Sequence, residues 1–344
     1  MSDIKRFVQI GAGGFGGVWV KAFAACPRAQ VVGLVDISPQ ALAEAGKTLN
    51  VPAERQFASL ADAMKLDFDA ALVCVPPSAR PAIYDTLARA GKHILTEKPL
   101  ADGIDAAKAA LKLQQETKIH FVVSQNYRYG GLIQALRNVL WSGQFGRPGV
   151  CQVDFHLYPR FFGFREQMPY PLIIDMSIHH FDLARFLLMS DPVSVVGKSW
   201  NGSWSVMKGD AASSLVFEMS YGMHFSYNSS WTTLRPPEHQ SSWNGTWYIE
   251  CDRGCVVLKG DSITGWKWSL NGEGRPVWGE PTPIPPIEFA GGQLCVLNQF
   301  IDQLNGGPIA PTTIADNIRS VAMVFGAVKA FETKAIVDIK AMLA

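Results

Sequence analysis

The sequence predicts an α/β protein with two domains. Three observations lead to this fold class. A glycine-rich run directly follows the first apolar segment, and short apolar segments then alternate with helical stretches as far as about residue 124. After about residue 150 the hydropathy pattern changes, and apolar and polar residues alternate within short segments. The length of 344 residues agrees with two domains, since one domain takes roughly 150.

The glycine-rich run, from Gly11 to Gly16, has the G-x-G-x-x-G spacing of a dinucleotide-binding turn. Gly11 lets the chain leave the strand sharply, Gly13 admits the pyrophosphate to the backbone, and Gly16 lets the next helix pack close to the sheet. A helix beginning near Gly14 would point free N–H groups at the phosphates. Asp36 closes the second apolar segment twenty positions after Gly16, as the acid of this motif does. The glycines alone would be a weak signal, but strand, helix and acid agree with them.

The first part of the chain indicates a parallel sheet with helices on both faces. The segment from Asp69 to Val75 is almost continuously apolar, as a strand buried on both faces should be, and Pro76-Pro77 ends it. Helices are expected over residues 38–49, 78–90 and 102–116, each opened by a Ser or Asp that can cap free N–H groups. The expected strands are residues 6–10, 30–36, 69–75, 93–96 and 120–124.

The second part indicates antiparallel strands with one covered face, and therefore a mostly β domain. Residues 281–286 are rich in proline and predict a stiff surface loop. Eight of the ten tryptophans lie between Trp200 and Trp278, where we expect most to serve the core or a subunit contact and one or two to line a substrate pocket. The expected strands are residues 150–158, 213–219, 224–230, 246–251 and 256–259, and the expected helices are 175–189, 293–304 and 313–333.

Composition argues against several classes of protein. With 48% hydrophobic and 18% charged residues, the chain has enough apolar material for substantial cores and too little charge for disorder. A net charge of +1 with scattered basic residues predicts no nucleic-acid or membrane partner. The first strand starts by about Arg6, so we expect no signal peptide, and no apolar run approaches the ~18 residues of a membrane span. The six sparse cysteines predict free thiols in the cytoplasm and no metal site.

Glu97-Lys98-Pro99 follows a predicted strand, at the sheet edge where ligands bind in open α/β folds. A lysine at this edge can hydrogen-bond a substrate oxygen and stabilise negative charge as a proton leaves, while Pro99 restrains the loop. The tripeptide by itself fits an ordinary solvated lysine better. Its functional interpretation therefore depends on the other motifs.

Asp175 and His179 are four residues apart, which places a carboxylate and an imidazole on one face of a predicted helix. His179 has a suitable pKa to take a proton near neutral pH, and the carboxylate would orient the ring and raise its basicity. The structural alternative makes Asp175 a helix cap and His179 an interior histidine, like His180 beside it. With the nucleotide turn and Lys98, however, the pair completes what a hydride-transfer enzyme needs.

The chain resembles the Gfo/Idh/MocA family, which contains relatives of glucose-fructose oxidoreductase and inositol dehydrogenase. The resemblance covers nearly the whole length, and the order and spacing of its motifs are specific. One departure is Arg80, where relatives often have histidine, and it leaves the cofactor contacts there open. The motifs are the Gly11–Gly16 turn, Glu97-Lys98-Pro99, Asn126-Tyr127-Arg128, the turn over residues 142–148 and Asp175-x-x-x-His179.

The resemblance implies a Rossmann NAD-binding domain over residues 1–124 and a substrate-binding and oligomerisation α/β domain over residues 125–344. The second domain would contain a large open, mostly antiparallel sheet that often makes dimer or tetramer contacts. The resemblance also implies that Lys98, Asp175 and His179 form a catalytic triad, with His179 as the general base. Glu97 and Asn126 match positions near the nicotinamide ribose.

Asp36 is expected to accept hydrogen bonds from the adenosine ribose and to repel a 2′-phosphate, and Ile37-Ser38 provides no arginine to bind one. NAD is therefore favoured over NADP. The candidate cofactor-binding residues are Gly11, Gly13, Gly14, Phe15, Gly16, Asp36, Pro76, Glu97, Lys98 and Asn126.

These observations predict an NAD-dependent dehydrogenase that oxidises a secondary hydroxyl of a sugar, an anhydrosugar or a cyclitol and works as a cytoplasmic homodimer or homotetramer. The lack of a basic cluster predicts a near-neutral substrate. Three alternatives stay open: an NAD-dependent glycosidase acting by transient oxidation, a non-catalytic NAD(P)-sensing regulator of the same fold, and reduction of a ketone in the reverse direction. The candidate substrate contacts are Lys98, Arg128, Tyr158, Arg160, Asp175 and His179.

Overall fold

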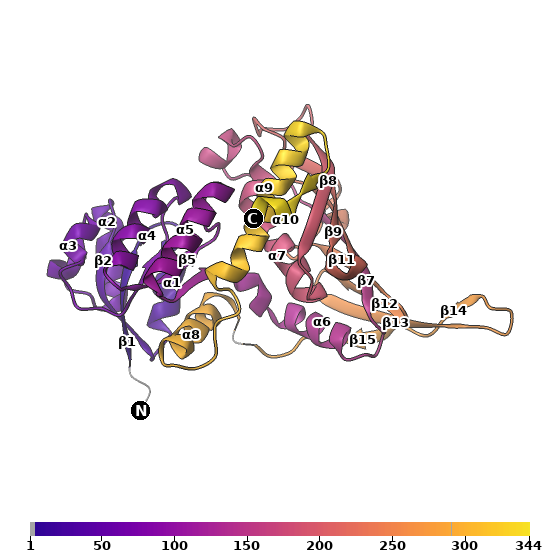
Figure 1. Cartoon of the computed structure of the whole chain (residues 1–344), viewed down its shortest axis with the longest axis horizontal. Coiled ribbons are helices and arrows are strands. Elements are labelled where there is room, and N and C mark those ends of the chain that lie inside the picture. Colours follow the sequence, from indigo (N-terminus) through magenta and orange to yellow (C-terminus); the bar gives the residue numbers. More distant parts are fainter. Residues whose placement is uncertain (1–3, 290) are drawn as a thin grey trace. The chain divides into compact units, whose positions relative to one another are not determined.

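The computed structural model describes residues 4–289 and 291–344, which form two compact units (Figure 1). The first unit contains the described residues up to Tyr129 together with those from 291 to Val321, and the second contains residues 130–289 and 322–344. The sequence pattern suggests a single division between residues 124 and 125, and it does not anticipate that residues 291–321 return to the first unit. Residues 291–321 belong to the first unit because helix α8 (Gly292–Leu304) packs on the core of that unit, where the rings of Phe7 and Phe300 lie 6.2 Å apart.

The first unit contains a parallel sheet of six strands in the order β3-β2-β1-β4-β5-β6. The order reverses direction between β1 and β4, and in open α/β sheets ligands bind at such a switch point, beyond the carboxyl ends of the strands. The predicted Rossmann domain is confirmed. The strands are β1 (Lys5–Ile10), β2 (Ala29–Val35), β3 (Gln56–Phe57), β4 (Ala70–Val73), β5 (His93–Glu97) and β6 (Phe121–Ser124).

Helices flank this sheet, and only one of the three predicted caps is correct. Ser38 accepts a hydrogen bond from the N–H of Ala41 at 3.3 Å, as an N-cap should. The other two helices start later than predicted, after Ala79 and Gly103, and neither has a side-chain cap. A short 3-10 turn, Pro77–Ala79, takes up the intervening residues before the first of them. Besides α8, the helices are α1 (Gly16–Ala24), α2 (Pro39–Leu49), α3 (Leu60–Ala63), α4 (Arg80–Arg89) and α5 (Ile104–Thr117).

The second unit is built on a sheet of ten strands in the order β14-β13-β12-β11-β7-β10-β9-β8-β16, with β15 paired to β13. Only the β7–β10 pair is parallel, so the prediction of a mostly antiparallel sheet is confirmed. The strands are β7 (Pro148–His156), β8 (Pro192–Trp200), β9 (Ala212–Met219), β10 (His224–Ser230), β11 (Thr246–Cys251), β12 (Gly254–Lys259), β13 (Ser262–Leu270), β14 (Pro276–Trp278), β15 (Thr282–Ile284) and β16 (Val337–Asp338).

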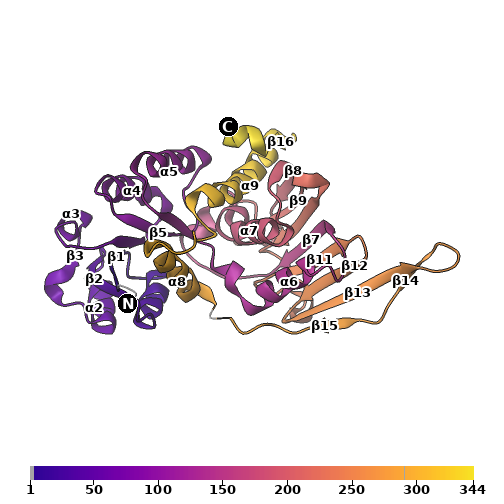
Figure 2. The ribbon, with the colours of Figure 1, turned by 60° about the horizontal axis from the view of Figure 1, so that its bottom comes forward.

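Helices α6 (Gly131–Trp141) and α7 (Ser177–Leu188) lie on one face of this sheet (Figures 1 and 2). The ring of Phe181 in α7 lies 5.0 Å from that of Phe217 in β9. The helix predicted over residues 175–189 begins instead as a π-helical turn, Leu172–Met176. The last described elements are α9 (Ile314–Thr333), within which the two units divide, and α10 (Ile339–Leu343).

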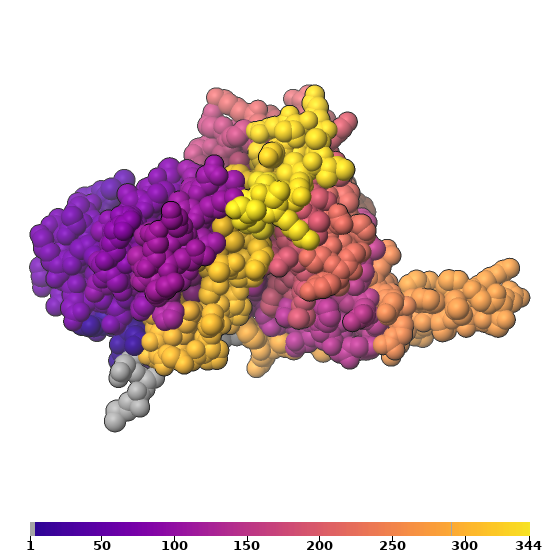
Figure 3. Space-filling view, viewed as in Figure 1, coloured from indigo at the N-terminus to yellow at the C-terminus, as the bar shows by residue number. Residues whose placement is uncertain are grey.

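The hairpin of β13 and β14 projects from the second unit (Figure 3). The prediction of a loop over residues 281–286 is wrong in its centre, because β15 pairs with β13 and places Ile284 opposite Ile263. Proline is tolerated there because β15 is an edge strand, which needs fewer N–H donors. Of the tryptophans clustered in the sequence, Trp231 and Trp247 are buried, whereas Trp200 and Trp278 are exposed. Across the described residues, no helix has the length and hydropathy of a membrane span.

Candidate active site

The glycine turn lies between β1 and α1 in the first unit. Helix α1 begins at Gly16 rather than near Gly14. The fold itself requires two of the glycines, because a Cβ on Gly11 would lie 2.2 Å from the Cys74 carbonyl oxygen and one on Gly16 would lie 2.4 Å from the Gly11 carbonyl oxygen. Gly13 is different, since its Cβ would make only ordinary contacts, 3.4 Å from the Ala41 Cβ and 3.9 Å from Asp36 Oδ2. Gly13 therefore leaves room for a ligand beside the backbone, as the predicted pyrophosphate site requires.

Asp36 follows β2 and is bound to the same turn. Its Oδ2 accepts hydrogen bonds from the N–H groups of Ala12 at 2.7 Å and Gly13 at 3.1 Å, and its Oδ1 accepts one from Ser38 at 2.8 Å. Partial burial raises the pKa of Asp36, but these backbone hydrogen bonds outweigh it and hold the pKa below the usual value. The carboxylate is therefore anionic at neutral pH and lies beside the turn, as a ribose-binding acid should. The neighbouring Ile37 is exposed.

Gln9 in β1 supports the glycine turn, and no motif in the sequence marks it as a site residue. Its side-chain amide donates hydrogen bonds to the carbonyl oxygens of Gly11 and Gly16, each at 3.0 Å. These two bonds fix both ends of the glycine turn to β1. A single polar residue within the apolar run from Phe7 to Ile10, two positions before Gly11, is the sequence signal that could have identified it.

Glu97 is the last residue of β5, and Lys98 and Pro99 follow it at the carboxyl edge of the first sheet. Burial raises the pKa of Glu97, although Lys98 and Trp19 oppose that effect. Its Oε1 accepts a hydrogen bond from Trp19 Nε1 at 2.9 Å, and its Oε2 accepts one from the Lys98 N–H at 3.0 Å. Glu97 thus connects the β5 edge to α1. The Lys98–Pro99 peptide is cis.

Arg80 holds this turn against the neighbouring strand. It is buried, and its Nε donates to the carbonyl oxygen of Val75 at 2.8 Å, while its Nη1 donates to the carbonyl oxygens of Glu97 and Pro99. The guanidinium therefore bridges the chain on both sides of Lys98 and the segment after β4. Sequence reasoning identified Arg80 only as a departure from the family pattern.

The remaining candidate site residues of the first unit lie in the turns that follow its strands. Pro76 precedes the 3-10 turn after β4, and Asn126 opens another, Asn126–Tyr129, after β6. Arg128 is buried, and its Nη2 pairs with Asp316 Oδ2 at 2.9 Å. Arg128 therefore anchors the start of α9 to the first unit, and its role as a substrate contact stays a prediction. Within the glycine turn, Gly14 has a positive φ and Phe15 is exposed.

Asp175 and His179 lie in the second unit, across the junction between the π-helical turn and α7. The structural alternative for Asp175 is wrong, because the residue at the cap position is Met176 and no side chain caps α7. His179 is buried in the first turn of α7. His180 is a core histidine, as its Nδ1 lies 2.9 Å from the Tyr227 hydroxyl and its Nε2 lies 3.0 Å from the Trp243 carbonyl oxygen.

Asp175 has a partner that the sequence did not indicate. Arg165 Nε donates to Asp175 Oδ2 at 2.7 Å, in the same unit. Of the two candidate substrate contacts nearby, Tyr158 donates a long hydrogen bond of 3.5 Å to the Trp204 carbonyl oxygen, and Arg160 lies over the Phe162 ring at 5.1 Å. The second unit therefore pairs the Asp175 carboxylate with the Arg165 guanidinium.

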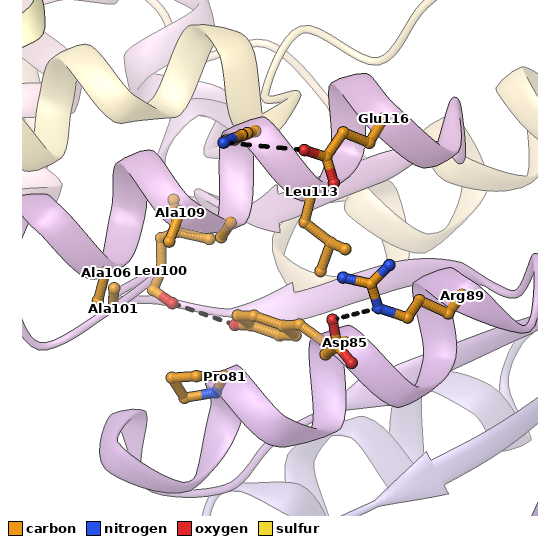
Figure 4. A pocket seen from close by; sticks show the side chains of 12 residues that line it. Pro81, Asp85, Arg89, Leu100, Ala101, Ala106, Ala109, Leu113 and Glu116 are labelled. Carbon is orange, nitrogen blue, oxygen red and sulfur yellow. Dashed lines mark hydrogen bonds and ion pairs between the residues drawn. The ribbon is translucent and has the colours of Figure 1, made fainter.

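A groove of about 340 Å³ lies between α4 and α5 (Figure 4). Leu100, Leu113 and several alanines form its apolar wall, and the ion pair of Asp85 and Arg89, at 2.7 Å, lies beside it. Neither the glycine turn nor Asp36 lines this groove. It is therefore separate from the nucleotide cradle.

Within the first unit, the structure places Asp36 against the glycine turn and the Glu97 side chain against the Lys98 N–H. In the second unit, Asp175 and His179 lie on either side of the junction between the π-helical turn and α7. The convergence of Lys98 with Asp175 and His179 stays a prediction. Within the described ranges, no cluster of three His, Cys, Asp or Glu side chains could hold a metal ion.

Two family models match the chain. One, described as an oxidoreductase family with an NAD-binding Rossmann fold, matches residues 5–125, and the other, the GFO/IDH/MocA C-terminal domain, matches residues 133–257. The chain belongs to the Gfo/Idh/MocA family. The expected resemblance is therefore confirmed, and so are an oxidoreductase and an NAD-binding Rossmann domain. The glycine turn with Asp36 fits NAD, because Gly13 leaves the backbone open to a pyrophosphate.

Relatives in the Gfo/Idh/MocA family include sugar and cyclitol dehydrogenases. The chain is 28% identical to the uncharacterized protein y4oX of Sinorhizobium fredii, over 94% of this chain and 92% of that protein. It is 32% identical to an inositol 2-dehydrogenase of Rhizobium meliloti, over 55% of this chain and 57% of that enzyme. It is 24% identical to a D-apiose dehydrogenase of Rhizobium rhizogenes, over 100% of this chain and 99% of that enzyme.

The fold of this Gfo/Idh/MocA member matches solved structures along its whole length. An oxidoreductase from Agrobacterium radiobacter, solved in complex with NAD+, L-tartaric acid and magnesium, has a TM-score of 0.85 at 21% identity, covering 98% of this chain and 99% of that one. A dehydrogenase from Bordetella pertussis, solved with NADH and UDP-GlcNAcA, has a TM-score of 0.79 at 18% identity, with 98% of each chain covered. These likenesses support the two-domain fold.

Proposed function

We propose that this protein is an NAD-dependent dehydrogenase that oxidises a secondary hydroxyl of a sugar, an anhydrosugar or a cyclitol. The observation that carries the proposal is that the chain contains every side chain that the reaction needs: Lys98 at the end of β5, and Asp175 with His179 at the start of α7. Relatives named inositol 2-dehydrogenase, 1,5-anhydro-D-fructose reductase and D-apiose dehydrogenase support this range of substrates.

Each reacting group has a distinct task in this proposal. The Lys98 ammonium donates a hydrogen bond to the substrate oxygen and stabilises the negative charge that develops on it. The His179 imidazole accepts the hydroxyl proton, and Asp175 orients and stabilises the ring. NAD, when bound, supplies the acceptor for the hydride that leaves the carbon. The substrate thus loses a proton and a hydride and becomes a ketone.

The fixed backbone around Lys98 supports its proposed role. Arg80 binds the carbonyl groups on both sides of Lys98, and Glu97 accepts a hydrogen bond from the Lys98 N–H. These bonds restrict the backbone from which the ammonium extends. A positioned donor stabilises a developing charge more effectively than a mobile one, because it needs no reorganisation during the reaction.

The proposal is tested by substituting the proton acceptor and the oxygen-binding lysine. In assays that follow NADH with a panel of sugars, anhydrosugars and inositols, Lys98→Met and His179→Ala should each lower kcat by about 10² or more. NADH affinity, measured by fluorescence, should change little. Lys65→Met and His239→Ala serve as controls, since both side chains are exposed. Near-normal turnover by both site variants would refute the assignment. Release of a free sugar without net NADH would indicate a glycosidase, and coenzyme binding without turnover would indicate a regulator.

We also propose that the protein assembles as a homodimer or homotetramer through the sheet of the second unit, and that it works in the cytoplasm. Val196 in β8 and Val216 in β9 are paired across the strands and exposed on one face, and Tyr248 in β11 is exposed as well. Exposed apolar side chains on a sheet face are typical of subunit contacts. Val216→Glu should reduce the mass measured by light scattering to that of a monomer, whereas Ile309→Glu, at an exposed site of the first unit, should not. An unchanged mass would exclude this interface.

A further inference from the structure

Arg165 lies against the proposed catalytic carboxylate. It belongs to a short 3-10 turn, Phe164–Gln167, and its Nε donates to Asp175 Oδ2 at 2.7 Å. Its guanidinium also lies over two aromatic rings, 5.3 Å from the centroid of Phe161 and 4.8 Å from that of Phe164. The Arg165 side chain is 34% exposed and that of Asp175 is 18% exposed. A partly exposed cation therefore lies beside the carboxylate that precedes His179 by four residues.

The segment that carries Arg165 is anchored on both sides. The Phe161 ring packs 4.8 Å from that of the buried Trp231. Further along, the Glu166 carbonyl oxygen accepts a hydrogen bond from the Lys208 N–H at 2.9 Å, and the Pro169 carbonyl oxygen accepts one from the Asp210 N–H at 2.8 Å. These contacts hold the backbone around Arg165 in place, and the bond to Asp175 together with the two aromatic rings orients its guanidinium.

The guanidinium has donors left after it binds Asp175. Only Nε is used for that bond, and neither terminal nitrogen of Arg165 makes a hydrogen bond to another of the residues that the structure describes. Two adjacent N–H groups in one plane match the two oxygens of a carboxylate. The aromatic rings cover part of the guanidinium surface, which weakens its hydration and favours an anionic partner over water.

Charge balance supports the same ligand. The Asp175 carboxylate by itself would repel an anionic substrate, but the Arg165 guanidinium balances that charge and offers its remaining donors on other edges of the same group. Sequence analysis predicts a near-neutral substrate from the lack of a basic cluster, and it does not detect a single arginine placed at the site by the fold. One preorganised arginine is sufficient for bidentate carboxylate recognition.

We propose that Arg165 binds a carboxylate of the substrate, so that the preferred substrates are sugar acids, such as uronates or aldonates, rather than neutral sugars. The inference rests on the proposed dehydrogenase function, because it identifies the substrate class of that same site. Arg165 acts as a specificity-determining residue. The terminal nitrogens of Arg165 hold the substrate carboxylate while the reacting hydroxyl of the substrate lies at His179.

The test compares each acid with its neutral amide. D-Glucuronate, D-galacturonate, D-gluconate and D-galactonate are assayed with NAD beside the corresponding amides. The wild type should favour the acids in kcat/KM by roughly 10- to 100-fold, the range expected for hydrogen bonds between charged groups. Arg165→Gln should remove this preference, and Arg165→Lys should keep part of it because the charge remains. Arg275→Gln is the matched control, since Arg275 is exposed on the projecting hairpin.

A binding measurement separates this inference from the proposed function. Calorimetric titration of the enzyme–NADH complex with the same acids should show binding that Arg165→Gln weakens by at least tenfold, with the melting temperature used to verify folding. Oxidation of neutral sugars as good as that of the acids would overturn the inference and leave the dehydrogenase intact. Acid binding that depends on Arg165, without turnover of any compound, would support the inference and refute the dehydrogenase. Absence of both binding and turnover with every acid would overturn the inference.

Discussion

Replacing Asp36 by Ser and Ile37 by Arg should move the coenzyme preference from NAD toward NADP. The Asp36 carboxylate is fixed by three backbone N–H groups, and it is expected to accept hydrogen bonds from the ribose of NAD and to repel a 2′-phosphate. Loss of hydrogen bonds to this charged acceptor should weaken NAD binding by about 1.5–3 kcal/mol, or roughly 10- to 150-fold. Ile37 is 93% exposed, so an arginine there displaces no packed side chain and can pair with the phosphate.

The assay for this double variant is kcat/KM for both coenzymes at one fixed substrate, together with the Kd of NADH and NADPH from fluorescence. The NAD/NADP ratio of kcat/KM should fall by about 10² or more, because the loss for NAD and the gain for NADP act together. Ile37→Gln is the matched control, since it changes the same exposed position without adding charge. A wild-type enzyme that prefers NADP, or a double variant whose ratio stays within about twofold of the wild-type value, would refute the reasoning.

Two further predictions follow from the glycine contacts and the buried histidine. Gly11→Ala should lower the free energy of unfolding in urea by about 3 kcal/mol or more, because the new Cβ would lie 2.2 Å from a backbone oxygen at a φ of +90°. Gly13→Ala should keep the wild-type stability and weaken NADH binding at least tenfold, because its Cβ would make only ordinary contacts within the protein. Loss of stability in both variants would contradict the assignment of Gly13 to the ligand. Burial lowers the pKa of His180 to about 4, below the unfolded value, so its contribution to stability is lost as the pH falls from about 6.5 toward 4. His180→Phe should reduce the stability loss between pH 7 and pH 5 by roughly 2 kcal/mol, and an unchanged pH slope would exclude His180 as a source of the acid sensitivity.

Sequence reasoning predicts best where the signal is local. The strand before Gly11, the spacing to Asp36 and the apolar β4 segment each fit one short stretch of chain, and the structure places them as a Rossmann cradle. The second sheet is also predicted in kind, since alternation marks strands with one covered face. Strands β8 and β13 were missed because a strand that is exposed on much of its surface has a weaker apolar pattern.

The long-range contacts could not be predicted in this way. Residues 291–321 return to the first unit because of packing such as that between Phe7 and Phe300, which no local pattern reports. Arg80 belongs to the same class, because its partners are carbonyl groups in two other loops and any residue type supplies a carbonyl. The one clue that such contacts leave in the sequence is an arginine without an acidic neighbour, because an arginine that is buried in the fold needs acceptors from elsewhere.

The junction before α7 does not use the Asp175 carboxylate as a helix cap, which agrees with the proposed role of Asp175 beside His179. An acid at this point normally caps the helix and spends its oxygens on free N–H groups. Here the π-helical turn precedes α7 directly, so the backbone is already helical before Ser177 and no side-chain cap is present. The Asp175 carboxylate is therefore left for side-chain partners, of which Arg165 is one. The same spacing of Asp and His in a helix that began at Asp175 would use the carboxylate as a cap, so the functional value of the motif depends on the turn that precedes it.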